Sequence, residues 1–247
     1  MKSTSPNPNL CLEAFFATVS PESTLSYRCH FAENERIILV DLEQLAEDKA
    51  VALLSAEEWN YFQRFRYPKR RREWLGGRIA AKAALLNTLD AGICRQASIL
   101  PDADGRPIVS GRVDSRLSLS ISHSNSYAVA MAIHGQNCGI DLQEVSDKLP
   151  ALTKYFAAAA ELEILAGQSE LGSQESALTM LWAVKEAMKK SLLANQPTIF
   201  SGIEMKQIET IGKQVWQCTC AVQGHALQTA LVYDFSPYIL ALSRGKE

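Results

Sequence analysis

The chain has few cysteines and histidines, and its apolar runs are too short to cross a membrane. Its 247 residues include six cysteines and four histidines, and no two cysteines form a Cys-x-x-Cys pair. Neither a disulfide framework nor a zinc site is therefore indicated. The first 20 residues lack the basic start and apolar segment of a secretion signal. We expect a cytoplasmic protein with reduced thiols and no membrane partner.

An excess of positive charge is also absent. The formal net charge is −2 at pH 7, which argues against a nucleic-acid-binding protein with a broadly basic surface. Hydrophobic residues make up 47% of the chain and charged residues 21%, so wholesale disorder is excluded. Any polyanionic ligand must therefore be bound by a local cluster of cations.

The length of the chain indicates two lobes. A chain of 247 residues can form two domains of ordinary size. The turn-forming sequence His-Gly-Gln-Asn at residues 134–137 is the best candidate junction. We expect an N-terminal lobe over residues 1–136, of which residues 1–10 are poorly ordered, and a C-terminal lobe over residues 137–247.

Both helices and strands are predicted, so the fold class is α+β. Ser55 and Glu58 have the spacing of a capping box at a helix start. Pro68 suits the first turn of a longer helix that extends to about Leu89. Apolar patterns predict the remaining elements, which are a helix around residues 178–192 and strands over 36–41, 117–122, 127–133, 138–145, 215–222, 226–233 and 238–242.

Asp141 is the first candidate for a functional carboxylate. In a strand, Asp141 and Gln143 face one side while Glu144 faces the other, because side chains alternate. An acidic side chain among the apolar residues of a buried strand is costly unless it is paired or binds a metal. A ligand role is therefore favoured over that of an ordinary aspartate at a strand end.

A charged strip on the last predicted helix is the second candidate. Its members lie at spacings of three or four residues and comprise Trp182, Lys185, Glu186, Lys189 and Lys190. Taken alone, this spacing is better explained by an exposed face with a Glu186–Lys190 ion pair than by a site. The presence of an acidic strand and a Ser-His segment in the same chain favours a site.

Ser122 and His123 permit three interpretations. A serine hydrolase dyad is weakly supported, because neighbours in a strand face opposite sides and the chain has no Gly-x-Ser-x-Gly segment. Contact with a phosphate and a structural role as a hydrogen-bonded core histidine are equally open.

Basic residues gather at the start of the first long helix. Residues 69–72 read Lys-Arg-Arg-Arg, and Arg78 and Lys82 follow. A cationic helix start opposes the helix dipole unless an anion binds there, although a solvated basic face is equally well supported. Gly76 and Gly77 indicate a close approach of a backbone or a ligand, because each interior glycine costs about 1 kcal/mol relative to alanine.

The segments together resemble the surfactin-type 4′-phosphopantetheinyl transferases. That family's pattern contains Arg-x-x-x-Gly, Gly-Lys-Pro, Ser-His-Ser, Gly-Ile-Asp-x-Glu and Trp-x-x-Lys-Glu-Ala-x-x-Lys. The chain has counterparts in the same order at residues 72–76, 105–107, 122–124, 139–143 and 182–190. The match spans about residues 55–205. It implies two similar α/β lobes with pseudo-two-fold symmetry, which is the 4′-phosphopantetheinyl transferase fold, and coenzyme A in the cleft between the lobes.

The resemblance also implies a reaction. Members of the family transfer the 4′-phosphopantetheine arm of coenzyme A to a serine of an acyl, polyketide or peptidyl carrier protein, and release adenosine 3′,5′-bisphosphate. Such carriers serve fatty acid, polyketide or nonribosomal peptide biosynthesis. The chain would then be a Mg²⁺-dependent enzyme, with coenzyme A as co-substrate and an apo carrier protein as its partner. Internal duplication favours a monomer, because one chain supplies both sides of the cleft.

Roles for individual residues follow from the same resemblance. Mg²⁺ would be held by Asp141, Gln143 and Glu186. Catalysis would depend on Asp141, Glu186, which accepts the serine proton, and Lys190, which neutralises the pyrophosphate. The residues expected to contact the coenzyme are Arg72, Arg78, Arg106, Pro107, Ser122, His123, Lys185 and Lys190, and Lys185 could also assist Glu186.

Two departures from the family pattern leave alternatives open. Gln143 stands where relatives often have a second acid, so an amide oxygen, a water or Glu144 brought round by a bulge would complete the metal site. Basic residues that some relatives carry before the first long helix are absent from residues 57–61. Residues 69–72 must therefore grip the 3′-phosphate, and which of them does so besides Arg72 is open. The alternative function is a degenerate module that binds coenzyme A or a carrier without efficient transfer, supported by Gln143 alone.

Overall fold

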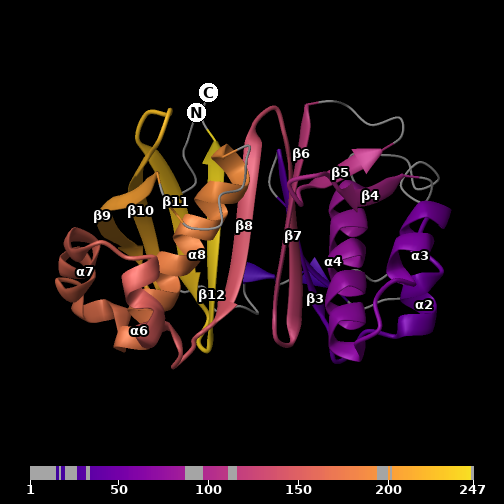
Figure 1. The fold of residues 1–247 in the computed structure, drawn as a ribbon, viewed down its shortest axis with the longest axis horizontal. Helices are drawn as coiled ribbons and strands as arrows, with labels where there is room; N and C mark the ends of the chain where they lie inside the picture. Colours follow the sequence, from indigo (N-terminus) through magenta and orange to yellow (C-terminus); the bar gives the residue numbers. More distant parts are fainter. Residues whose placement is uncertain are drawn as a thin grey trace.

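A computed structural model describes residues 15–16, 18–19, 27–31, 34–86, 97–110, 116–193, 200 and 202–245. These residues form two five-stranded antiparallel sheets and one two-stranded sheet (Figure 1). The segment 1–10, for which we expect poor order, lies outside the described residues. No helix of the described part combines the length and apolar character needed to cross a membrane.

The first five-stranded sheet comes from the N-terminal part of the chain. Its strands, in spatial order, are β1 (Thr18–Val19), β2 (Tyr27–Phe31), β3 (Glu35–Asp41), β7 (Tyr127–His134) and β6 (Leu117–Ser124). The N-terminal part also contains the helices α2 (Glu47–Val51), α3 (Ala56–Phe62) and α4 (Pro68–Leu86). Its strands β4 (Ser98–Pro101) and β5 (Pro107–Ser110) form the two-stranded sheet. Leu75 and Ile79 of α4 share a core with Ile38 and Ala130, so α4 covers one face of this sheet.

The second sheet comes from the C-terminal part. Its strands, in spatial order, are β8 (Asn137–Glu144), β12 (Tyr238–Gly245), β11 (Gln228–Asp234), β10 (Val215–Val222) and β9 (Ile203–Gly212). The helices are α6 (Leu149–Leu152), α7 (Ala159–Ala166) and α8 (Gln174–Leu192), and short 3₁₀ turns lie at Thr153–Tyr155 and Ser169–Leu171. Val184 and Met188 of α8 share a core with Ala241, so α8 covers one face of this sheet.

The two sheets pack against each other through a third core. Ile37 and Met131 of the first sheet join Ile140 and Leu240 of the second in this cluster. The order of layers is therefore α4, first sheet, second sheet and α8 (Figure 1). This arrangement fits the α+β class and the two halves that the sequence predicts. The domain boundary at residue 136 stays a prediction.

A buried ion pair occurs in the same form in both halves. In the first half, Lys82 of α4 bonds to Glu58, the third residue of α3, at 2.9 Å, and the other oxygen of Glu58 accepts the N–H of Ile99. In the second half, Lys185 of α8 bonds to Glu161, the third residue of α7, at 2.6 Å. The other oxygen of Glu161 accepts the N–H of a strand residue in the same way. The two halves therefore contain the same arrangement, in which a lysine of the long helix and a strand N–H bind one buried glutamate of a short helix.

Most predicted elements are present, with small shifts at their ends. The capping box exists, because Ser55 Oγ accepts the Glu58 N–H and the Glu58 carboxylate accepts the Ser55 N–H. The hairpin over β6 and β7 turns at Asn125, which has a left-handed φ of 46°. The predicted end of α4 near Leu89 lies outside the described residues. The sequence patterns do not predict β1, β2, α2, β4, β5 or β9.

Candidate functional site

The first candidate, Asp141, lies in the middle of β8 and is 2% exposed. Its neighbours Ile140 and Leu142 point into the core between the sheets. Alternation therefore turns Asp141 to the other face of β8, which packs against α8. Gly139 makes this approach possible, because a Cβ at that position would lie 1.9 Å from the carbonyl oxygen of Ala187 in α8.

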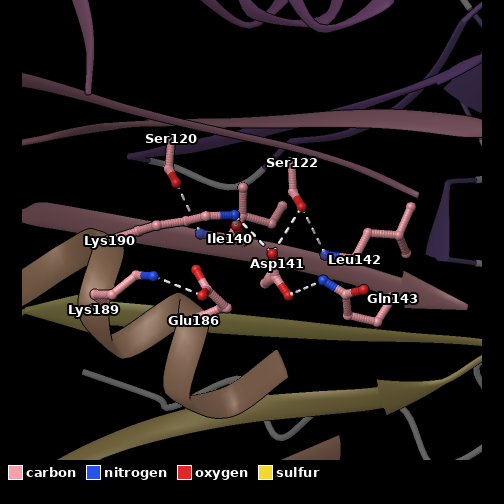
Figure 2. A network of polar contacts seen from close by, with 9 residues as sticks. All are labelled: Ser120, Ser122, Ile140, Asp141, Leu142, Gln143, Glu186, Lys189 and Lys190. Atoms are coloured by element: carbon pink, nitrogen blue, oxygen red, sulfur yellow. Dashed lines mark hydrogen bonds and ion pairs between the residues drawn. The ribbon is translucent and has the colours of Figure 1, made fainter. Parts of the chain in front are cut away.

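Three donors hold the Asp141 carboxylate (Figure 2). Ser122 donates to Oδ1 at 2.8 Å, the Lys190 ammonium lies 2.7 Å from the same oxygen, and the Gln143 amide donates to Oδ2 at 2.8 Å. Lys190 also donates to the Ile140 carbonyl at 2.9 Å. The buried charge is therefore fully hydrogen-bonded, which removes most of the cost of its burial.

Glu186 lies one helical turn before Lys190, on the side of α8 that faces Asp141 (Figure 2). Its side chain is 17% exposed and bonds to Lys189 at 2.6 Å. The ion pair expected for an exposed strip, Glu186 with Lys190, is not formed, because Lys190 bonds to Asp141 instead. The helix and the strand thus bring two carboxylates and two ammonium groups together.

These side chains fit a divalent cation that prefers oxygen. Among the described residues, no three His, Cys, Asp or Glu side chains gather closely enough to hold a metal by themselves. Asp141 and Glu186 supply carboxylate oxygens, and rotation of the Gln143 amide would present a third, neutral oxygen. Glu144 does not substitute, because β8 pairs with β12 without a register shift and no bulge turns Glu144 round.

A pocket of about 650 Å³ adjoins this cluster and is lined by both halves. Its lining includes Arg106, the first residues of β5, part of β6, residues 135–138 at the start of β8, and Lys190. Arg106 donates to the Leu193 carbonyl, while its Nε is buried without a hydrogen-bond partner. The pocket is therefore lined by cations from both halves, and one of them, Lys190, also bonds to the Asp141 carboxylate.

His123 forms a second polar cluster at the end of β6. Its Nε2 lies 3.1 Å from Arg70, and its Nδ1 lies 3.9 Å from Glu73, both residues of α4. Burial lowers the pKa of His123, and the Glu73 carboxylate opposes this shift. The imidazole is therefore neutral near pH 7 and can accept a hydrogen bond from Arg70. Arg72 is exposed and makes no polar contact with the described residues.

Two family models match the chain on either side of the turn between β7 and β8. The 4′-phosphopantetheinyl transferase N-terminal domain matches residues 64–133, and the 4′-phosphopantetheinyl transferase superfamily matches residues 137–243. The holo-[acyl-carrier-protein] synthase of Exiguobacterium sibiricum is 36% identical over 106 residues, which cover 38% of this chain and 82% of that protein. The chain belongs to the 4′-phosphopantetheinyl transferase superfamily.

Further members of the superfamily match in the same way. A holo-[acyl-carrier-protein] synthase of Geobacillus sp. is 38% identical over 109 residues, which cover 39% of this chain and 91% of that protein. A solved holo-(acyl-carrier-protein) synthase of Bacillus anthracis, in complex with CoA (3′,5′-ADP), is 28% identical, covers 41% of this chain and 94% of that one, and has a TM-score of 0.36. Each match covers most of the relative but less than half of this superfamily member.

Two residues with predicted coenzyme contacts make no polar contact with Asp141, Glu186 or His123 in the described part of this superfamily member. Lys185 is 3% exposed and bonds to Glu161 and the Phe156 carbonyl. Arg78 is 7% exposed, and its guanidinium lies 4.6 Å from the ring centre of Trp74. Burial lowers the pKa of Arg78 to about 10, against the attraction of a nearby carboxylate. The structure therefore does not bring Lys185 or Arg78 to the site.

The hydrolase interpretation finds no support in the geometry. Ser122 bonds to Asp141, whereas His123 faces Arg70 and Glu73. A nucleophilic serine would need a hydrogen bond to its base. None joins these two side chains in the part of the chain that the structure describes.

Arg70 is the residue that the sequence patterns leave unresolved. It was one of four basic residues in a row, and only its position on the α4 face toward β6 distinguishes it. Helical geometry alone separates Arg70 from Arg72 by about 200° around the axis. The sequence does not show that His123 of β6 lies opposite Arg70 of α4, and this contact is what distinguishes Arg70 from its basic neighbours.

Proposed function

We propose that the protein transfers the 4′-phosphopantetheine arm of coenzyme A to a serine of an acyl, polyketide or peptidyl carrier protein and releases adenosine 3′,5′-bisphosphate. The observation that carries this proposal is the buried Asp141 carboxylate, which lies beside Glu186 and bonds to Lys190, a residue that lines a pocket with cations. Family membership supports the reaction, and the relatives' names support the acyl carrier protein as one acceptor.

Mg²⁺ would be held by oxygens of Asp141, Glu186 and Gln143. When bound, it supplies positive charge that stabilises the pyrophosphate during transfer. Gln143 contributes no charge, so we expect weaker metal binding than a third carboxylate would give. Lys190 bonds to Asp141 in the structure and also lines the pocket, so its ammonium would stand beside the pyrophosphate.

The transfer itself requires one proton acceptor and one group that stabilises the leaving charge. Glu186 accepts the proton of the carrier serine while the serine oxygen bonds to the phosphorus. The bond from that phosphorus to the oxygen of adenosine 3′,5′-bisphosphate breaks, and Lys190 stabilises the negative charge that develops there. Lys189 holds the Glu186 carboxylate at 2.6 Å and fixes its direction.

The pocket between the halves would receive the rest of the coenzyme. Arg106 and Pro107 line it and would border the adenosine. His123 and Arg70 form the cluster that suits the 3′-phosphate, with the exposed Arg72 nearby in sequence. Because both halves line this pocket, one chain supplies a complete site, which supports a monomer.

The proposal is tested by intact-mass analysis of purified apo carrier proteins after incubation with the protein, coenzyme A and Mg²⁺. We expect a gain of one phosphopantetheine group on a serine, and no gain when a chelator is present. Asp141→Ala and Glu186→Ala should each lower the rate at least about 100-fold. Glu163→Ala, which removes an exposed carboxylate on α7, is the matched control and should be fully active.

The degenerate binding module is the alternative function, and Gln143 is the feature that favours it. It predicts coenzyme A binding without a mass gain on any carrier. Gln143→Glu would then be the first reversion to test. Full activity of the Asp141 or Glu186 variant would instead contradict the site assignment.

A further inference from the structure

A carboxylate lies inside the basic cluster around His123. The side chain of Glu73 on α4 is 13% exposed, whereas those of Lys69 and Arg70 are more than half exposed. The Glu73 oxygens lie 3.9 Å from the Lys69 ammonium, 3.7 Å from Arg70 Nη1 and 3.9 Å from His123 Nδ1. A negative charge here would repel the phosphate that we assign to this cluster, so Glu73 needs a role that offsets the repulsion.

The contact with Arg70 fixes where the proton of the neutral His123 ring lies. A guanidinium can only donate hydrogen bonds, so His123 Nε2, which lies 3.1 Å from Arg70 Nη1, is the acceptor and carries no proton. The single proton of the neutral imidazole is therefore on Nδ1, the nitrogen that faces Glu73. The other neutral form would turn the Nδ1 lone pair toward the Glu73 carboxylate, which repels it.

The charged groups that face His123 come from three other elements of the described structure. Burial lowers the pKa of His123 most strongly, and Glu73 of α4, the second influence in size, raises this pKa. Arg70 of α4 and Lys190 of α8 lower the same pKa, whereas Asp141 of β8 raises it. The ring is therefore neutral at neutral pH when no ligand is bound, and Nε2 is the nitrogen without a proton.

A phosphate that binds at His123 Nε2 needs a proton on that nitrogen. Phosphate oxygens accept hydrogen bonds, and at about pH 7.5 a phosphate monoester is mostly a dianion with no proton to give. Because Glu73 keeps the first proton on Nδ1, a second proton must move from solvent to Nε2. The imidazolium no longer accepts from Arg70, so Nε2 and Arg70 Nη1 become two donors 3.1 Å apart that can share one phosphate oxygen.

We propose that coenzyme A binding takes up a proton at His123 Nε2, and that Glu73 is the positioning residue that imposes this uptake by holding the other proton on Nδ1. This inference rests on the proposed function, because the 3′-phosphate of coenzyme A is the anion that meets His123. Proton uptake makes the affinity for coenzyme A fall as the pH rises above the pKa of the unliganded ring. The fall ends above the higher pKa that the phosphate and Glu73 give to the bound ring.

Isothermal titration calorimetry of coenzyme A binding, in HEPES and in Tris at about pH 7.5, measures this uptake directly. The two buffers differ in their enthalpy of ionisation, so the difference in observed binding enthalpy gives the number of protons taken up per coenzyme A. A chelator in both buffers excludes proton exchange caused by metal binding. The matched probe is 3′-dephospho-coenzyme A, which lacks only the 3′-phosphate.

We expect the wild-type protein to take up about half a proton or more with coenzyme A, and less than about 0.1 proton with 3′-dephospho-coenzyme A. Glu73→Gln should lower the uptake with coenzyme A to less than about half of the wild-type value, because a neutral amide lets the single proton lie on either ring nitrogen. Glu47→Gln is the matched control and should keep the wild-type uptake, since it removes a carboxylate that pairs with Arg71 of the same helix α4.

Three results would contradict the inference and leave the proposed function standing. Equal uptake with the two coenzymes would place the titration outside the phosphate cluster, and this comparison needs only the wild-type protein. Binding of coenzyme A without uptake would exclude protonation of His123. Unchanged uptake in Glu73→Gln would remove the role of Glu73. A wild-type protein that bound no coenzyme A would contradict the proposed function first, and this inference with it.

Discussion

Lys185 illustrates how a single residue can be placed wrongly by its neighbours in the sequence. It precedes Glu186 directly, and both belong to the motif that carries the family resemblance. On a helix, however, consecutive residues point about 100° apart. Lys185 turns inward to Glu161, whereas Glu186 faces Asp141.

Lys185→Met tests the structural role of this residue. The variant leaves the buried Glu161 carboxylate without its partner, so we expect the free energy of unfolding to fall by about 3 kcal/mol in urea denaturation. Lys82→Met breaks the equivalent pair with Glu58 and should cost a similar amount. The Lys185→Met/Glu161→Gln double variant should lose less than the sum of the single variants.

A coenzyme contact by Lys185 would give a different result. Lys185→Met would then weaken coenzyme A binding while the free energy of unfolding stayed close to that of the wild type. Lys82→Met serves as the matched control, because it removes the same interaction from the other half of the molecule.

At the scale of elements, the site depends on how closely α8 approaches β8. Glu186 and Lys190 lie on the helix, and Asp141 lies on the strand, so their separation is set by this contact. Gly139 permits it, because the α8 backbone passes where a side chain would stand. The glycine is therefore required by packing, and not by a left-handed backbone.

Gly139→Ala should push α8 away from β8. Because the added methyl would meet the Ala187 carbonyl at 1.9 Å, we expect a loss of at least about 2 kcal/mol of unfolding free energy, together with weaker Mn²⁺ binding. Gly167→Ala, at the end of α7, is the control, since its added Cβ would make only ordinary contacts of 3.5 Å or more. A Gly139→Ala protein as stable as this control would contradict the tight α8–β8 contact.

At the scale of the whole molecule, the two halves share a core and are also joined by a buried ion pair. Arg244 of β12 bonds to Glu35 of β3 through two contacts of 2.6 and 2.9 Å, and Glu35 is 5% exposed. Each sheet buries one face against its own long helix and the other against the opposite sheet. Separation of the two halves would therefore expose apolar surface on both sheets.

We therefore expect one cooperative unfolding transition for the whole chain. Arg244→Leu leaves the Glu35 carboxylate buried and should lower the free energy of unfolding by about 2 kcal/mol, less than for a fully buried pair because Arg244 is partly exposed. Lys206→Ala, from an exposed pair with Glu204, should change it by less than about 1 kcal/mol. Two separate transitions in urea, followed by circular dichroism, would argue that the halves unfold independently.

The sequence patterns predict much of the fold because several signals are local. The capping box at Ser55 and the alternation along β8 each depend on a few neighbouring residues. The candidate set Asp141, Glu186 and Lys190 was found through motifs, and the structure brings these three side chains together.

The sequence by itself determined the class of fold, the main helices and strands, and that Asp141 and Gln143 share one face of β8. Only the tertiary structure decided that the serines of β6 face β8, that Arg70 and not Arg72 reaches His123, and that Lys185 is buried. The physical reason is that alternation and helical spacing define the faces of an element, but not what covers each face. That choice depends on contacts between residues far apart in the chain.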